Sequence, residues 1–194
     1  MKKLLWLAVA LLGFQMPSQN ALAEERLDRA IVEKITVKAN VDDVWRAWTT
    51  TEGIKTFFAP EAKVELRVDG PFEIYINPLA EAGQKGADDM RILAFQDKKM
   101  LTFTWNAPPF LAEARKQRTV VIVRFISRGD SLTDVTLQHV GWGEGNEWDK
   151  AFDYFTKAWP SVMKNLKKRF DDGPVDWKPW LEQLKRGQAA NQKK

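Results

Sequence analysis

A stripe of large apolar residues near the carboxyl end constrains the fold of this chain more than any other feature. The residues recur every three or four positions, which is the spacing of one face of an α-helix. They are Trp148, Phe152, Phe155, Trp159, Val162, Leu166 and Phe170. Asn146 is expected to cap this helix, with Asp149 in its first turn, and Gly173-Pro174 to end it. Pro160 opposes the helix by roughly 3 kcal/mol, but each buried large side chain contributes about 1.5 to 3 kcal/mol, so we expect a kinked, well-packed helix.

The first part of the chain after residue 30 predicts one strand and two short helices. Apolar side chains share one face of an expected strand over residues 31–38. A helix follows, because Asn40 can cap it and apolar residues after it recur at helical spacing. A second short helix is expected over residues 52–58, ending before Pro60.

Alternating apolar residues predict about six antiparallel strands between residues 64 and 139, the first over residues 64–68. Polar turns separate the members of three strand pairs: Asp69-Gly70-Pro71, Asp97-Lys98-Lys99 and Arg128-Gly129-Asp130. Residues 77–89 are expected to form a loop. After the long helix, residues 177–184 predict a short helix that packs back on the body, followed by an unstructured tail from Gly187.

These elements predict a single α+β domain. A sheet with one apolar face and a helix with one apolar face must bury them against each other. We therefore expect a curved antiparallel sheet of about six to seven strands around the long helix, with the two short helices after the first strand. The domain is predicted over residues 31–173, with a linker over 24–30 and a tail with a short helix over 174–194. Such a curved sheet tends to leave an apolar cavity beside the helix.

Residues 1–23 have the features of a cleavable signal peptide. Lys2 and Lys3 precede an apolar run over residues 4–14, and Ala21-Leu22-Ala23 has the small-residue pattern of a cleavage site. The run is shorter than the roughly twenty residues that a bilayer requires. We therefore expect cleavage after Ala23, a periplasmic or secreted mature protein, and no stable membrane anchor.

The composition excludes several kinds of site and partner. The chain has no cysteine, which excludes disulfides and a lipidated amino-terminal cysteine. Loss of Lys2 and Lys3 with the signal would lower the formal charge from +4 to +2. This balance is not typical of a nucleic-acid-binding protein, so we expect no nucleic acid partner.

Four segments, in this order, carry a family resemblance. They are VDDVWRAWTTTEGIKTFFAP, GPFEIYI, LTFTWNAPP and TLQHVGWGEGNEWDKAFDYFTKAWPSVMKNLKKRF. The chain resembles the START-like (helix-grip, Bet v-type) superfamily, whose members are also called SRPBCC proteins. Within it, the chain is similar to the branch related to the activator of the heat-shock protein 90 ATPase. The resemblance covers about residues 31–173.

The resemblance implies a curved antiparallel sheet that grips the carboxyl-terminal helix around an apolar pocket. It does not imply one activity, because relatives bind lipids, hormones or chaperones, and some catalyse cyclisation or hydrolysis. This chain differs from the chaperone activators in its predicted export signal. The ATPase that such activators serve is cytosolic, so it should be absent from the compartment expected for this protein.

Aromatic residues are the main indication of a ligand. Small-molecule pockets are largely apolar with few polar groups, and the predicted fold gathers many rings near the mouth of its cavity. The candidate ligand-binding residues are Trp48, Phe57, Phe58, Trp105, Phe110, His139, Trp142, Trp148, Phe155 and Trp159. The alternative for each ring is packing in a solid aromatic core.

Two further features have open interpretations. Residues 106–113, which include Pro108-Pro109 and Phe110, predict a stiff apolar loop that either covers the pocket or simply connects two strands. Arginines on the expected strands are either anchors for an anionic ligand head or solvent-facing residues. They are Arg67, Arg91, Arg115 and Arg124.

His139 is the only histidine, and it lies beside a glycine-rich turn over residues 141–145. It could act as a general base, oriented by Glu144, Glu147 or Asp149. However, the chain has no second histidine, no cysteine and no G-x-S-x-G motif, so neither a usual zinc site nor a nucleophilic triad can be assembled. We expect no catalytic residue, metal or cofactor, and a structural role for His139 in bonding the turn, with a ligand contact as the alternative.

The sequence therefore predicts a protein that binds a small hydrophobic molecule in the periplasm without catalysing a reaction. One alternative is a protein-interaction or chaperone-associated module in which the aromatic loop docks a protein partner. A second alternative is an enzyme that acts on an apolar substrate.

Overall fold

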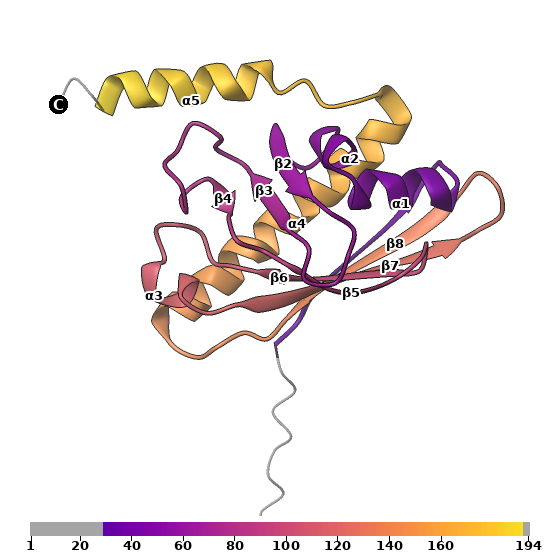
Figure 1. Ribbon diagram of the computed structural model, residues 1–194, viewed down its shortest axis with the longest axis horizontal. Coiled ribbons are helices and arrows are strands. Elements are labelled where there is room, and N and C mark those ends of the chain that lie inside the picture. The colour runs from indigo at the N-terminus through magenta and orange to yellow at the C-terminus, as the bar shows by residue number, and fades with distance from the viewer. Residues whose placement is uncertain (1–28, 192–194) are drawn as a thin grey trace, which may run out of the picture.

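The computed structural model of the protein describes residues 29–191 (Figure 1). The predicted signal peptide lies outside the described residues. In chain order the elements are β1 (Ile31–Val37), α1 (Val41–Thr49), α2 (Thr51–Lys55), β2 (Glu61–Val64), β3 (Phe72–Tyr75), β4 (Gly86–Ala87), β5 (Ile92–Gln96), β6 (Met100–Trp105), α3 (Ala112–Arg115), β7 (Thr119–Ser127), β8 (Thr133–Val140), α4 (Asn146–Asp172) and α5 (Lys178–Asn191).

The strands form two antiparallel sheets. The larger has the order β1-β8-β7-β6-β5, and the smaller has the order β2-β3-β4. β1 and β8 pair along their lengths, with Ile31 opposite His139. A hydrogen bond of 2.8 Å from the Phe72 amide to the Met90 carbonyl joins the two sheets. The α+β helix-grip class is confirmed, but the expected single sheet of six to seven strands is divided into two.

The strand predicted over residues 64–68 is wrong in its second half. β2 ends at Val64, while Leu66 and Val68 are 37% and 64% exposed. The chain turns here, because the Gly70 amide donates to the Arg67 carbonyl and Asp69 adopts a φ of 59°. The turn preference of the Asp-Gly pair therefore prevails over the apolar alternation, and the smaller sheet separates from the larger one.

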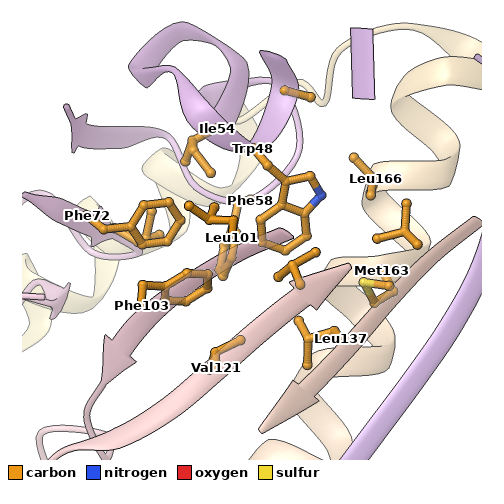
Figure 2. Packing of buried hydrophobic residues seen from close by; sticks show 14 of the residues in the cluster. Trp48, Ile54, Phe58, Phe72, Leu101, Phe103, Val121, Leu137, Met163 and Leu166 are labelled. Carbon is orange, nitrogen blue, oxygen red and sulfur yellow. The ribbon is translucent and has the colours of Figure 1, made fainter. Parts of the chain in front are cut away.

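α4 crosses one face of the larger sheet, and the smaller sheet, α1 and α2 lie on the same side of that sheet (Figure 1). Side chains from these elements form one core. Figure 2 shows Met163 and Leu166 of α4 facing Leu137 of β8, with Trp48 of α1 between the layers. The apolar face predicted for α4 is confirmed, although Met163 rather than Val162 takes the fully buried position.

The ends of the long helix differ from the expectation at one residue. α4 ends before Gly173 as predicted, and it continues through Pro160, whose side chain is exposed. The expected Asn146 cap is wrong, because Gly145 is the N-cap residue and Asn146 is already helical. Gly145 has a φ of 97°, which a glycine adopts without strain.

The two short helices pack beside the larger sheet. Asn40 caps α1 as predicted, and its side-chain oxygen accepts a 2.9 Å hydrogen bond from the Asp43 amide. Trp45 of α1 packs edge-on against Phe125 of β7, with ring centroids 5.3 Å apart. α2 is shorter than predicted and ends at Lys55. α1 therefore covers part of the larger sheet that α4 leaves open.

α5 packs back on the domain, as the sequence predicts. The Trp177 indole donates a 2.6 Å hydrogen bond to the Lys55 carbonyl, and the Gln188 amide donates a 2.8 Å bond to the Leu79 carbonyl. The unstructured tail expected from Gly187 is wrong over residues 187–191, which continue α5, and the rest of that tail lies outside the described residues. Within residues 29–191, no helix has the length and apolar character needed to cross a membrane.

Candidate functional site

Aromatic side chains fill the centre of the domain between the sheet and α4. Trp48, Phe57 and Trp159 are each at most 1% exposed. The ring centroids of Trp48 and Phe57 are 5.1 Å apart, and those of Phe58 and Trp159 are 5.9 Å apart. Edge-on ring pairs at these distances stabilise a packed interior. The structure therefore places these four candidate ligand residues in the hydrophobic core, and none of them lines the pocket described next.

A pocket of about 540 Å³ opens at one end of this core. Its walls come from the β3–β4 connection, the β6–α3 connection, α4 and α5. Three of the candidate ligand residues line it: Trp105, Phe110 and Phe155. Its volume lies in the range of small-molecule sites, and rings and aliphatic groups form most of its surface. The structure thus brings together only part of the predicted site.

One wall of the pocket comes from α5. Trp180 and Leu184 line it, and the Trp180 indole donates a 2.7 Å hydrogen bond to the carbonyl of Ile76, another lining residue. Tyr154 of α4 also contributes. The ligand-binding residues predicted from the sequence do not include these, although Trp180 and Leu184 have the four-residue spacing of one helical face. Their role depends on where α5 docks, which that spacing alone does not determine.

Arg115 ties two walls of the pocket together. Its guanidinium donates to the carbonyls of Gly83 and Gly86, each at 2.8 Å, and to the Ala107 carbonyl. It also pairs with the Asp88 carboxylate at 3.2 Å, and both side chains are nearly buried. Burial lowers the pKa of Arg115, and Asp88 partly opposes this effect. Arg115 therefore holds the two walls in place. Its N–H groups donate to oxygens of the protein and are not directed into the pocket.

The other three arginines considered as anion anchors are exposed and do not line the pocket. They are Arg67, Arg91 and Arg124. Their exposure agrees with the solvent-facing alternative.

His139 of β8 is fully buried, and its ring packs against those of Phe155 and Trp159 of α4. Its Nε2 lies 2.7 Å from the Thr119 hydroxyl, and its Nδ1 accepts a 2.9 Å hydrogen bond from the Trp159 indole. These side-chain partners belong to β7 and α4, and not to the glycine turn that the sequence predicts. The histidine carbonyl accepts from the indole of Trp142 at 3.0 Å. His139 thus connects β8 with the two elements packed against it.

The environment of His139 does not suit a general base. Burial lowers its pKa from 6.5 to about 3, so the imidazole is neutral at physiological pH. Both ring nitrogens are already paired, and the side chain does not line the pocket. In this conformation neither nitrogen is positioned to take a proton from a molecule in the pocket.

Trp142 packs against the main core beside His139, and Trp148 belongs to a second, smaller cluster. The Trp142 and His139 rings are 4.1 Å apart, and Trp148 packs in a small cluster with Leu111 of the β6–α3 connection. Neither tryptophan lines the pocket. Gly143 allows the chain to pass close to Trp148, because a Cβ at that position would overlap the indole.

The β6–α3 connection forms the rim of the pocket. Phe110 is 70% exposed, and its ring packs edge-on against Tyr154 with centroids 5.9 Å apart. The following residues enter α3, where the backbone amides of Glu113 and Ala114 donate to the Glu147 carboxylate at 2.8 and 2.9 Å. This connection borders the pocket, and its opening as a lid stays a prediction. Among residues 29–191, no group of three or more potential metal ligands occurs.

Comparison with known proteins identifies the family. A family model described as activator of Hsp90 ATPase homolog 1-like protein matches residues 38–171. The chain belongs to this family. The matched region ends before α5. The wall that Trp180 and Leu184 provide therefore lies outside the matched region, while the other walls lie inside it.

Solved structures show the same fold at low identity. The protein MLL2253 from Mesorhizobium loti is 20% identical with a TM-score of 0.59, covering 76% of this chain and 100% of its own. CalU16 from Micromonospora echinospora is 23% identical with a TM-score of 0.56, covering 82% and 83%. The Aha1 dimer from Colwellia psychrerythraea is 16% identical with a TM-score of 0.57, covering 75% and 98%. No curated protein matches the chain.

Proposed function

We propose that this protein binds a small, mostly apolar molecule in the pocket between the β6–α3 connection and α5, without catalysing a reaction. The observation that carries the proposal is the pocket of about 540 Å³ with a predominantly aromatic and aliphatic lining. Moving apolar surface from water into such a site contributes about 25 cal/mol per Å². The wall from α5 makes the site a feature of the whole chain rather than of the matched family region.

Much of the pocket is held in shape before a ligand enters. Arg115 joins the 83–88 segment to Ala107, and the Trp180 indole is bonded to Ile76. Side chains that are already ordered lose little conformational entropy on binding, which favours affinity. The neutral, fully paired His139 supports binding without proton transfer.

The experiment is a titration of the protein with an environment-sensitive naphthalene dye, with Trp180→Ala as the test variant. We expect Trp180→Ala to weaken dye binding roughly tenfold, because it removes a large apolar wall of the pocket. Trp177→Ala is the matched control, since Trp177 is also a hydrogen-bonded tryptophan beside α5 but does not line the pocket. Equal dye binding by wild type and Trp180→Ala, or equal losses in both variants, would contradict the pocket as the binding site.

We further propose that the protein acts outside the cytoplasm. The charged, apolar and small-residue order of residues 1–23 supports export. Expression of the full chain in a Gram-negative host, followed by mass spectrometry of the periplasmic fraction, tests this. A mature chain that begins at Glu24 is expected, and a full-length product confined to the cytoplasm would reject the proposal.

Docking of a protein partner is the second candidate function. The observation that favours it is the 70% exposed Phe110 at the pocket rim, together with the family's name as activators of the Hsp90 ATPase. The dye titration separates the two candidates when it is repeated with Phe110→Ser. A partner-docking surface predicts loss of partner capture in this variant, whereas a ligand pocket predicts weaker dye binding, because Phe110 also lines the pocket.

A further inference from the structure

The indole of Trp105 is a hydrogen-bond donor without a partner in the wall of the pocket. Trp105 is 5% exposed and lines the pocket from the end of β6. Within the part of the chain that the structure describes, its buried Nε1 makes no hydrogen bond. Nearly all buried polar groups in proteins are paired, because leaving a donor unpaired is costly. Because Trp105 also lines the pocket, its unpaired donor is a candidate partner for an acceptor on a ligand.

The rings packed around Trp105 offer no hydrogen-bond acceptor to its indole. Its ring centroid lies 5.3 Å from that of Trp159 and 5.8 Å from those of Phe58 and Phe103. These neighbouring rings supply packing but no oxygen. An acceptor for the indole can instead come from a molecule in the pocket that Trp105 lines.

Asn106, the next residue, is a second buried polar group at this end of the pocket. It is 4% exposed and lines the pocket. Its amide donates to the Asp88 carbonyl at 3.5 Å, which is long for a hydrogen bond. The side chain of Asn106 therefore has donor capacity that a ligand oxygen could also use. The other polar lining side chains, Asn77, Gln84 and Lys85, are less buried.

The charge distribution favours a neutral oxygen over a carboxylate. Arg115 has its donors directed at three carbonyls and Asp88. Lys85 is the only cation among the described lining residues, and it is half-buried over the Tyr75 ring at 5.1 Å. A carboxylate beside Trp105 would be buried without a cation against it, which is strongly unfavourable.

From the Trp105 and Asn106 donors we infer that the ligand is a mainly apolar, uncharged molecule that carries a carbonyl-type oxygen at its buried end. The inference rests on the proposed function of the pocket. The oxygen accepts from the Trp105 indole, with Asn106 beside it. The apolar part extends along Phe110, Tyr154 and Trp180 toward solvent.

Fluorene and fluorenone form a suitable probe pair, because they share a flat tricyclic skeleton. They differ at one position, where fluorene has a CH₂ group and fluorenone has a carbonyl. Their affinities are measured by calorimetric titration for wild type, Trp105→Phe and Trp48→Phe. Trp48 is the matched control, since its buried indole is also unpaired within residues 29–191 but does not line the pocket. We expect the ratio of fluorenone to fluorene affinity to fall roughly five- to tenfold in Trp105→Phe and to stay unchanged in Trp48→Phe.

The indole proton resonance of Trp105 in the wild type gives a readout that does not depend on the folding of any variant. Fluorenone is expected to move it downfield, and fluorene is expected not to do so. Binding of both probes with the same affinity ratio in wild type and Trp105→Phe, without that shift, overturns the inference but leaves the pocket function standing. Failure of both probes to bind overturns the pocket function itself. Binding of fluorene-carboxylate as tightly as fluorenone overturns the neutral class of ligand.

Discussion

The indole Nε1 of Trp159 donates a 2.9 Å hydrogen bond to Nδ1 of His139. Because an indole nitrogen can only donate, Nδ1 of the histidine must be unprotonated. The imidazole proton therefore lies on Nε2, which donates to the Thr119 hydroxyl at 2.7 Å. That hydroxyl in turn donates to the Trp105 carbonyl at 3.3 Å. One directional chain of hydrogen bonds thus joins α4, β8, β7 and β6 beside the pocket.

Acid is expected to destabilise the protein through His139. The folded-state pKa is about 3, below the ordinary value of 6.5, so only the unfolded chain takes up this proton as the pH falls from 6.5 toward 3. The contribution of neutral, buried His139 to the free energy of unfolding is fully present above pH 6.5 and is lost progressively as the pH falls below this value. Between pH of about 7.5 and 5, the free energy of unfolding should fall by about 2 kcal/mol.

Urea unfolding at the two pH values measures this loss, with His139→Gln as the variant that cannot titrate. His139 is the only histidine, so the comparison isolates one group. An equal loss of stability in wild type and His139→Gln would show that other groups cause the pH dependence.

Thr119→Val should destabilise the domain by about 1 to 3 kcal/mol, because the buried Nε2 proton of His139 loses its acceptor. Thr119→Ser is the control, since it keeps the hydroxyl, and it should cost clearly less. Thermal and urea unfolding of both variants provides the measurement. A Thr119→Val variant as stable as the wild type would show that the hydrogen bond to His139 contributes little to stability.

Arg115→Ala should lower the free energy of unfolding by about 3 to 5 kcal/mol, because it leaves the nearly buried Asp88 carboxylate without its cation. Dye binding should weaken as well, since the 83–88 segment loses its connection to Ala107. Arg124→Ala is the control, because Arg124 is exposed on β7, and its change should stay within about 0.5 kcal/mol. Equal effects of the two substitutions would contradict a positioning role for Arg115.

Pro160→Ala should stabilise the protein by up to about 3 kcal/mol. Proline in a helix interior lacks the amide that would donate to Thr156, and the exposed ring of Pro160 adds no buried contact. Lys157→Ala, at another exposed position of α4, should change stability by less than about 0.5 kcal/mol. A destabilised Pro160→Ala variant in urea unfolding would mean that the proline supports a helix geometry that the domain requires.

The candidate site was predictable only in part, because aromatic residues at helical or strand spacing are equally suited to a core and to a pocket. Trp48 and Phe57 became core, whereas Trp105 and Phe155 lie where the core meets the pocket. The difference depends on which elements close over each ring. Trp180 was missed because its contribution requires α5 to dock beside the β3–β4 connection.

The residue pattern alone predicts the periodic elements: the apolar face of α4, the Asn40 cap of α1, the two long hairpins and the α+β class. These follow from local spacing and turn chemistry, which act within a few residues. The division into two sheets, the partners of His139 and the place of the pocket could be seen only in the folded molecule. These depend on contacts between residues far apart in the chain, such as Trp159 with His139 and Arg115 with Asp88, and no local pattern specifies them.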